Sequence, residues 1–155
     1  MKPSMEVAGW AAILAVLAGL VVVEGRSRAE LERRVPVSAQ ELYRTLARSR
    51  TAWQVVDVRE DLAGGYEEAR VPGALPMPGC ELARAPAQAR ERIHASVPTV
   101  IVTAEGAGPD LRRCAAFFTS ARVLAGGMGA WSDANLPEDA GAYSPPSAKA
   151  GGGCL

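Results

Sequence analysis

The chain has 155 residues, with 17 basic and 17 acidic side chains, so its formal net charge is zero. This length suits one ordinary domain with appendages, and the balanced charge argues against a nucleic-acid partner. The three cysteines show no CxxC or Cys/His spacing, which indicates a reducing compartment, or at least a fold without disulfides. The single histidine, His94, has no thiol near it in sequence, so we expect no metal and no cofactor.

An uncharged, apolar run extends from Val7 to Val23 between two glutamates. As a helix at about 1.5 Å per residue it measures roughly 25 Å, slightly less than the roughly 30 Å hydrocarbon core of a bilayer. We therefore expect residues 5–24 to form a single transmembrane helix. A cleaved signal peptide is the alternative, but no small-x-small cleavage site follows the run.

Four arginines lie in the charged segment 25–34, whereas the amino-terminal side of the apolar run offers only Lys2 and the α-amino group. The positive-inside rule therefore predicts a single-pass protein of the cell membrane whose soluble domain lies in the cytoplasm. The segment 25–34 can either contact anionic lipid headgroups or act as a solvated spacer.

The globular part is expected to begin at Val35. Ser38 and Glu41 have capping-box spacing, which predicts a helix that ends near residue 50. The run from Trp53 to Glu60 is too continuously apolar for a half-exposed strand, and it predicts a buried parallel strand that ends in charged residues.

The middle of the chain gives weaker signals. Pro72-Gly73 predicts a turn by its own chemistry. Cys80 and Glu81 are expected to begin a short helical piece, and His94 to lie at or near the surface.

The segment from Thr99 to Trp131 organises the rest of the chain. Its predicted order is a strand (100–102), a Gly-rich loop (105–108), a helix (111–119), a short strand (122–124) and a Gly-rich turn (126–131). In open α/β sheets, a buried strand that leads through a Gly-rich turn into a helix forms a pocket at the carboxyl end of the strand.

Three motifs occur in order along the chain: Asp57-Val58-Arg59-Glu60, Pro72-Gly73-Ala74 and Gly126-Gly127-Met128-Gly129-Ala130-Trp131. With the strand–loop–helix pattern they resemble a rhodanese-like domain over about residues 35–139. This predicts a three-layer α/β domain with a central parallel sheet of about five strands, preceded by the transmembrane helix. The Pro/Gly-rich residues 140–155 form a tail, and Asn135 is expected to end the last helix in a left-handed conformation.

In active rhodaneses, a cysteine at the start of the pocket loop holds a sulfane sulfur as a persulfide, and backbone N–H groups stabilise its negative charge. The resemblance places Ala104 at this position. Neither neighbour replaces the cysteine, because the Thr103 hydroxyl accepts sulfane sulfur poorly and the Glu105 carboxylate opposes an anion site. The predicted pocket-loop residues are Thr103, Ala104, Glu105, Gly106, Ala107, Gly108 and Asp110.

The resemblance also implies that Asp57 and Arg59 brace the loops near the active site. Arg70, where most relatives have histidine, is assigned the same bracing role. The pocket loop is about two residues longer than the usual pattern and lacks its terminal Arg-Ser. Asp110, in the first turn of the following helix, would weaken the attraction for an anionic ligand.

The other thiols do not replace the missing one. Cys114 lies one turn after Leu111 and one turn before Phe118, which predicts a buried, inert thiol in the core. Nothing in the sequence places Cys80 over the pocket. Cys154 belongs to the Pro/Gly/Ser/Ala-rich tail, where we expect an exposed thiol.

These features favour a membrane-anchored, non-catalytic rhodanese-like protein: a binding module or an accessory subunit of a membrane complex, with protein partners. The alternative is a divergent sulfurtransferase or sulfur carrier that uses a different cysteine. A phosphatase-like relative would still require the missing cysteine. A third hypothesis is that the anchor itself pairs with other helices through its small-residue stripe, Ala8, Ala12, Ala15 and Gly19.

Overall fold

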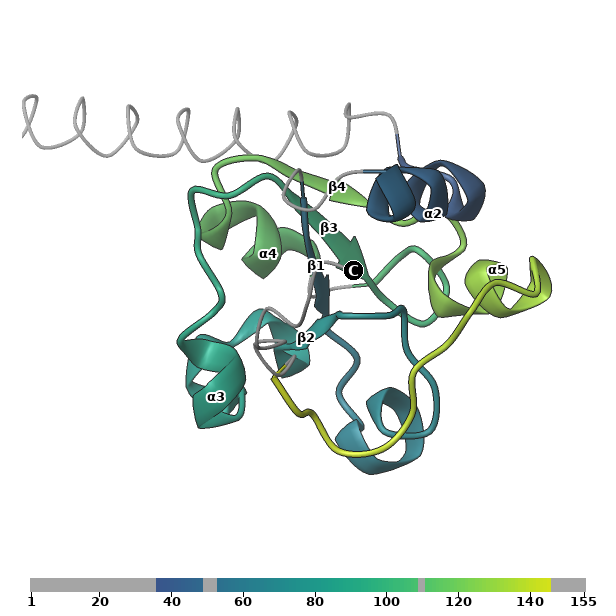
Figure 1. The fold of residues 1–155 in the computed structure, drawn as a ribbon. Coiled ribbons are helices and arrows are strands. Elements are labelled where there is room, and N and C mark those ends of the chain that lie inside the picture. Colours follow the sequence, from purple (N-terminus) through teal and green to yellow (C-terminus); the bar gives the residue numbers. More distant parts are fainter. Residues whose placement is uncertain (1–35, 49–52, 109–110, 146–155) are drawn as a thin grey trace, which may run out of the picture. The chain divides into compact units, whose positions relative to one another are not determined.

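The computed structural model describes residues 36–48, 53–108 and 111–145 (Figure 1). In these residues the centre of the fold is a sheet of four parallel strands in the order β2-β1-β3-β4. The strands are β1 (Gln54–Asp57), β2 (Leu75–Pro76), β3 (Thr99–Val102) and β4 (Ala121–Val123). The predicted buried parallel strands are thus confirmed, although β1 is shorter than the predicted 53–60 segment.

The predicted number of about five strands is corrected to four within the described part of the chain. At the outer edge of β4, Val37 makes an isolated parallel bridge with Leu124. The Val37 N–H donates to the Val123 carbonyl at 2.9 Å, and the Ala125 N–H donates to the Val37 carbonyl at 2.8 Å. This pairing stops after one residue because the chain enters a helix at Ala39.

Helices cover both faces of the sheet, which confirms the predicted α/β architecture (Figure 1). On one side lie α2 (Ala39–Arg48) and α5 (Gly127–Asp133), and on the other lie α3 (Ala87–Arg90) and α4 (Leu111–Phe117). Because side chains alternate along a strand, neighbouring residues of β3 serve opposite faces. All four residues of β3 are buried, as a strand covered on both faces requires.

Three short helical segments also lie between β1 and β3. They are a single π-helical turn, η1 (Leu62–Tyr66), and two short 3₁₀ helices, η2 (Pro78–Cys80) and η3 (Leu82–Arg84). The short helical piece expected to begin at Cys80 and Glu81 is present as η3, but it begins at Leu82, because Cys80 ends η2 and Glu81 is the N-cap of η3. Gly73 adopts φ +74°, which fits the predicted turn, and His94 is exposed as expected.

Two predicted helix boundaries are confirmed by backbone geometry. The Glu41 N–H donates to Ser38 Oγ at 3.2 Å, so Ser38 caps the amino end of α2. Asn135, which follows the C-cap residue Ala134 of α5, has φ +49° and provides the expected left-handed termination.

The core between the sheet and the α2/α5 layer is closed by Trp131, which is completely buried. Its indole N–H donates to the Pro137 carbonyl at 2.9 Å, so this aromatic ring leaves no buried donor unpaired. The interaction fixes α5 and the segment that follows it to the sheet.

The predicted transmembrane helix (5–24), the charged segment (25–34) and the last ten residues of the tail lie outside the described residues. Among residues 36–48, 53–108 and 111–145, no helix is both long and apolar enough to cross a membrane.

Candidate functional site

A hollow of about 360 Å³ lies where β1 and β3 end. Because parallel strands place their carboxyl ends at one edge of a sheet, the segments after β1 and β3 face each other across this hollow. Its wall is formed by Val58, Arg59, Glu60, Asp61, Gly65, Thr103, Ala104, Ala107 and Gly108.

The loop that follows β3 is held by the first turn of α5. The Thr103 carbonyl accepts a hydrogen bond from the Met128 N–H at 2.9 Å, and the Ala104 carbonyl accepts one from the Gly129 N–H at 3.1 Å. Thr103 also caps the loop from within, because its Oγ1 accepts a hydrogen bond from the Gly106 N–H at 2.8 Å. The loop conformation is therefore fixed by partners inside the domain.

Two glycines make this contact possible. Gly127 has φ +58°, and a Cβ added there would lie 2.4 Å from the Thr103 carbonyl oxygen. Gly106 has φ +76°, and its Cβ would lie 2.5 Å from the Gly126 nitrogen. Only residues without a side chain let these two backbones approach so closely.

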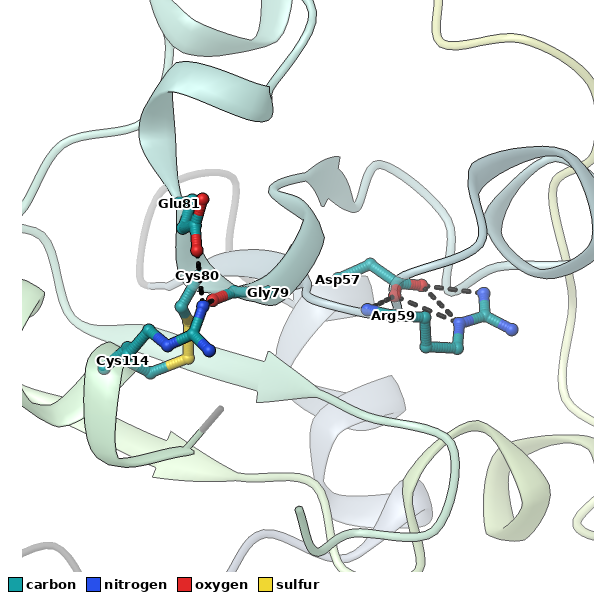
Figure 2. The surroundings of a disulfide bond; sticks show 7 residues. Asp57, Arg59, Gly79, Cys80, Glu81 and Cys114 are labelled. Atoms are coloured by element: carbon teal, nitrogen blue, oxygen red, sulfur yellow. Dashed lines mark hydrogen bonds and ion pairs between the residues drawn. A yellow bond between two sulfur atoms is a disulfide. The ribbon is translucent and has the colours of Figure 1, made fainter. Parts of the chain in front are cut away.

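Asp57 and Arg59, at the end of β1, form an ion pair in which Arg59 Nη2 lies 2.7 Å from Asp57 Oδ2 (Figure 2). The Asp57 side chain is 1% exposed and that of Arg59 14%, so the pair is largely shielded from water. The Arg59 backbone N–H donates to Asp57 Oδ1 at 3.1 Å, and its Nη2 donates to the Ala69 carbonyl at 2.6 Å. Arg59 therefore connects the wall of the hollow to the segment that precedes β2.

The rim of the hollow carries acidic groups that already have partners. The hydrogen bond from Arg84 holds the pKa of Glu60 below its ordinary value. The Asp61 carboxylate caps η1 by accepting a hydrogen bond from the Gly64 N–H at 2.9 Å. Within the described residues there is no group of three or more His, Cys, Asp or Glu that could hold a metal ion.

The structure brings most of the predicted loop residues to the hollow. Thr103, Ala104, Ala107 and Gly108 form part of its wall. Glu105 and Gly106 belong to the same loop without lining the hollow, and Asp110 lies outside the described residues. The Ala104 side chain is exposed, whereas Thr103 directly before it is buried.

Arg70 lies elsewhere. Its guanidinium carbon is 4.6 Å from the centroid of the Tyr66 ring, and its Nη1 donates to the Gly141 carbonyl. It lines a second hollow of about 540 Å³ that is bordered by the first residues of β1. Arg70 thus ties the segment before β2 to the end of the domain, away from the loop that begins at Ala104.

Sequence reasoning missed the wall contributed by Val58, Glu60, Asp61 and Gly65. The available signal was the order of the chain: these residues follow a strand that pairs with β3, so they share its carboxyl edge.

Cys80 and Cys114 form a disulfide, with their Cα atoms 5.3 Å apart (Figure 2). The prediction of a fold without disulfides is therefore wrong, and so is the prediction of a free thiol at Cys114. The predicted burial of Cys114 is confirmed, since it is 0% exposed. Neither cysteine lines the hollow at Ala104.

The fold and the hollow define an α/β domain with a preformed loop at the end of its central strand. A family model, described as the rhodanese-like domain, matches residues 38–134. The chain therefore belongs to the rhodanese-like domain family. No match to a curated protein was found.

Solved structures with the same fold support this assignment. The rhodanese-like domain of the Alr3790 protein from Anabaena is 21% identical, with a TM-score of 0.53, and the alignment covers 79% of this chain and 89% of that one. The thiosulfate sulfurtransferase from Pseudomonas aeruginosa is 20% identical, with a TM-score of 0.56, over 79% of this chain and 23% of its own. The 3-mercaptopyruvate sulfotransferase SseA from Escherichia coli is 17% identical, with a TM-score of 0.54, over 71% and 53%.

Proposed function

We propose that this chain is a non-catalytic rhodanese-like module in which Ala104 occupies the position of the family's nucleophile. The observation that carries this proposal is the place of Ala104. Ala104 directly follows the buried Thr103, the first residue after β3, and its carbonyl accepts a hydrogen bond from the Gly129 N–H of α5. Its exposed methyl group lines the hollow. A methyl group has no lone pair with which to accept a sulfane sulfur, so the loop lacks a nucleophile where the chemistry needs one.

The disulfide supports the same reading. A sulfur carrier needs a thiolate, and the sulfur atoms of Cys80 and Cys114 are bonded to each other. Cys154, outside the described residues, is the one remaining cysteine of the sequence. A divergent sulfurtransferase would have to use Cys154, or reduce the Cys80–Cys114 bond first.

We further propose that the module serves as a binding or accessory subunit in a membrane, anchored by residues 5–24. The apolar run of the sequence motivates the anchor. The preformed hollow, with its loop fixed by α5 and its wall braced by the Asp57–Arg59 pair, offers a partner protein a small, rigid docking point. Cross-linking in native membranes tests this role: the intact chain should trap the same neighbouring membrane protein repeatedly, and a variant without residues 1–24 should not.

A thiosulfate:cyanide sulfurtransferase assay on the full chain in detergent tests the absence of catalysis. We expect thiocyanate formation at the rate of the protein-free control, both for the wild type and for Cys154→Ser. Turnover by the wild type would contradict the proposal. Turnover that disappears in Cys154→Ser would favour the divergent sulfurtransferase instead.

A further inference from the structure

The Cys80–Cys114 disulfide joins the turn η2 to the helix α4 (Figure 2), and no described residue of either element lines the hollow itself. Cys80 ends η2, and Cys114 lies in α4, the helix that follows the loop opened by Ala104. Cys80 is 6% exposed and Cys114 is 0% exposed, so the bond lies inside the domain.

On the η2 side, the contacts lead to the wall formed after β1. The Gly79 N–H donates to the Val58 carbonyl at 3.0 Å, and Val58 lines the hollow. A Cβ added to Gly79 would lie 2.5 Å from Glu60 Oε1, another wall residue. The turn that carries Cys80 is therefore packed directly behind this wall.

On the α4 side, the contacts lead to the wall formed after β3. Gly108, the last described residue of the loop, lines the hollow, and its carbonyl accepts a hydrogen bond from the Leu111 N–H at 3.4 Å. Cys114 lies one helical turn further on. The disulfide thus links η2, which is hydrogen-bonded to the wall formed after β1, covalently to α4, which follows the wall formed after β3.

Non-covalent contacts also join α4 to η2 and to the residue after it. Arg113 Nη1 donates to the Gly79 carbonyl at 3.3 Å and pairs with Glu81 at 2.5 Å, but the side chains of Arg113 and Glu81 are 52% and 47% exposed, and solvent weakens such a pair. Cys80 itself has φ +58°, a conformation that residues with a side chain rarely adopt. The turn therefore depends on its surroundings to keep this shape.

We propose that the Cys80–Cys114 disulfide is a redox-dependent brace of the hollow, formed in an oxidising compartment. In this reaction the two thiols lose two protons and two electrons, the S–S bond forms, and a disulfide-bonded oxidant is reduced to its dithiol. Oxidation fixes α4 and the loop before it against η2, and reduction releases them. Disulfides persist in oxidising compartments and are rare in the cytosol, so the domain faces the side opposite to the cytoplasmic one that the arginines of segment 25–34 favour.

The proposal does not depend on what the hollow binds, and its first test counts thiols in cells. Cells that express the full chain are quenched with acid, denatured and treated with a maleimide-linked polymer that shifts the protein once per free thiol. We expect one shift, from Cys154, before reduction and three after it, and for Cys154→Ser none before reduction and two after it. Two free thiols in Cys154→Ser before reduction would overturn the proposal.

Hydrogen–deuterium exchange on the purified full chain tests the brace itself. The oxidised wild type is compared with the chemically reduced wild type and with a Cys80→Ala/Cys114→Ala double variant, with Cys154→Ser as the control. At exchange times too short for exchange through global unfolding, we expect amide exchange in α4 and in the loop before it to accelerate roughly tenfold in both forms without the bond, while β1 and β3 stay protected. Unchanged exchange in α4, or an equal acceleration through all strands, would overturn the proposal.

Discussion

Asp57 and Arg59 show how single side chains set the geometry of the site. The carboxylate of Asp57 is almost completely buried and receives both a backbone and a guanidinium hydrogen bond from Arg59. Removing one partner of such a pair leaves a buried charge without compensation, which is far more costly than losing an exposed ion pair. The bracing role that the sequence motif implies is therefore a matter of stability as well as of loop shape.

We predict that Asp57→Asn destabilises the fold by about 3 kcal/mol, because the guanidinium of Arg59, which is only 14% exposed, then lacks its counter-ion. Urea denaturation of the full chain measures this change. Glu60→Gln is the matched control at the same edge of the sheet, since its pair with Arg84 is exposed, and we expect its denaturation midpoint to stay at the wild-type value. Equal midpoints for both variants would contradict the prediction.

Tyr66 and Tyr143 offer a second comparison. The Tyr66 hydroxyl donates to the Ala74 carbonyl at 2.6 Å in the interior, whereas the Tyr143 hydroxyl is buried without a hydrogen-bond partner. We expect Tyr66→Phe to cost about 1.5 kcal/mol and Tyr143→Phe to be neutral or slightly stabilising. Thermal unfolding of the two variants measures the difference, and a larger loss for Tyr143→Phe would contradict this account.

Tyr66 also makes stability depend on pH. Burial raises the pKa of Tyr66 above its ordinary value, so above about pH 10 only the unfolded chain releases this proton. The contribution of the protonated Tyr66 hydroxyl to the free energy of unfolding is fully present below about pH 10. Above that pH it decreases by at most about 1.4 kcal/mol per pH unit. The advantage of the wild type over Tyr66→Phe should therefore shrink above about pH 10; a constant advantage would contradict the assignment.

At the scale of elements, the loop after β3 depends on the turn that begins α5. Two glycines at that contact have positive φ values, and their missing side chains leave room for the opposing backbone. These glycines are Gly106 in the loop and Gly127, the second glycine of the Gly126-Gly127 motif. Together they let the first turn of α5 donate its N–H groups to the carbonyls of Thr103 and Ala104.

We predict that Gly127→Ala destabilises the domain by about 3 kcal/mol, because it adds a clash with the Thr103 carbonyl to a left-handed backbone. Gly73→Ala is the control: Gly73 also has positive φ, but nothing lies within 4 Å of its Cβ position. Its cost should be about 1 kcal/mol, the backbone contribution alone. Chemical denaturation distinguishes the two, and equal losses would show that the contact with Thr103 matters little.

The disulfide between η2 and α4 should also be visible in the free energy of unfolding. It closes a loop across a sequence separation of 34, for which restriction of the unfolded chain corresponds to about 4 kcal/mol. We expect Cys80→Ala/Cys114→Ala to lose a stabilisation of this size in urea denaturation. A matching loss in the reduced wild type separates the bond from the effect of substitution, and an unchanged midpoint in both would contradict the estimate.

At the scale of the whole molecule, local sequence patterns predicted most of the secondary-structure elements. They did not predict the Cys80–Cys114 bond, which depends on contacts between distant segments of the chain. Capping at Ser38, the apolar run 100–102 and the left-handed Asn135 each depend on a few neighbouring residues, and each is confirmed. The Cys80–Cys114 bond depends on how η2 and α4 pack together, and spacing alone does not reveal that. The fifth strand fails for a local reason, because α2 begins two residues after Val37.

For the candidate site, too, local sequence predicted one part, and long-range contacts determine the other. The sequence placed Ala104 and its loop at the end of the central strand, where the structure also has them. It assigned Arg70 a place near the same loops, but the antiparallel bridge between Arg70 and Asp139 draws that segment toward the end of the domain. A bridge between residues so far apart in sequence follows from the closed fold and from no local pattern.

The most direct test of the proposal that Ala104 occupies the nucleophile position is to place a cysteine there. The full-length Ala104→Cys variant, made in a Cys154→Ser background, is incubated with thiosulfate and analysed by intact-protein mass spectrometry. Ala107→Cys is the matched control, since Ala107 is also exposed and lines the same hollow. We predict that Ala104→Cys gains the mass of one sulfur atom as a persulfide, while Ala107→Cys and the Cys154→Ser parent do not. Persulfide on the parent, or equal loading of both variants, would contradict the claim that position 104 holds a vacant nucleophile site.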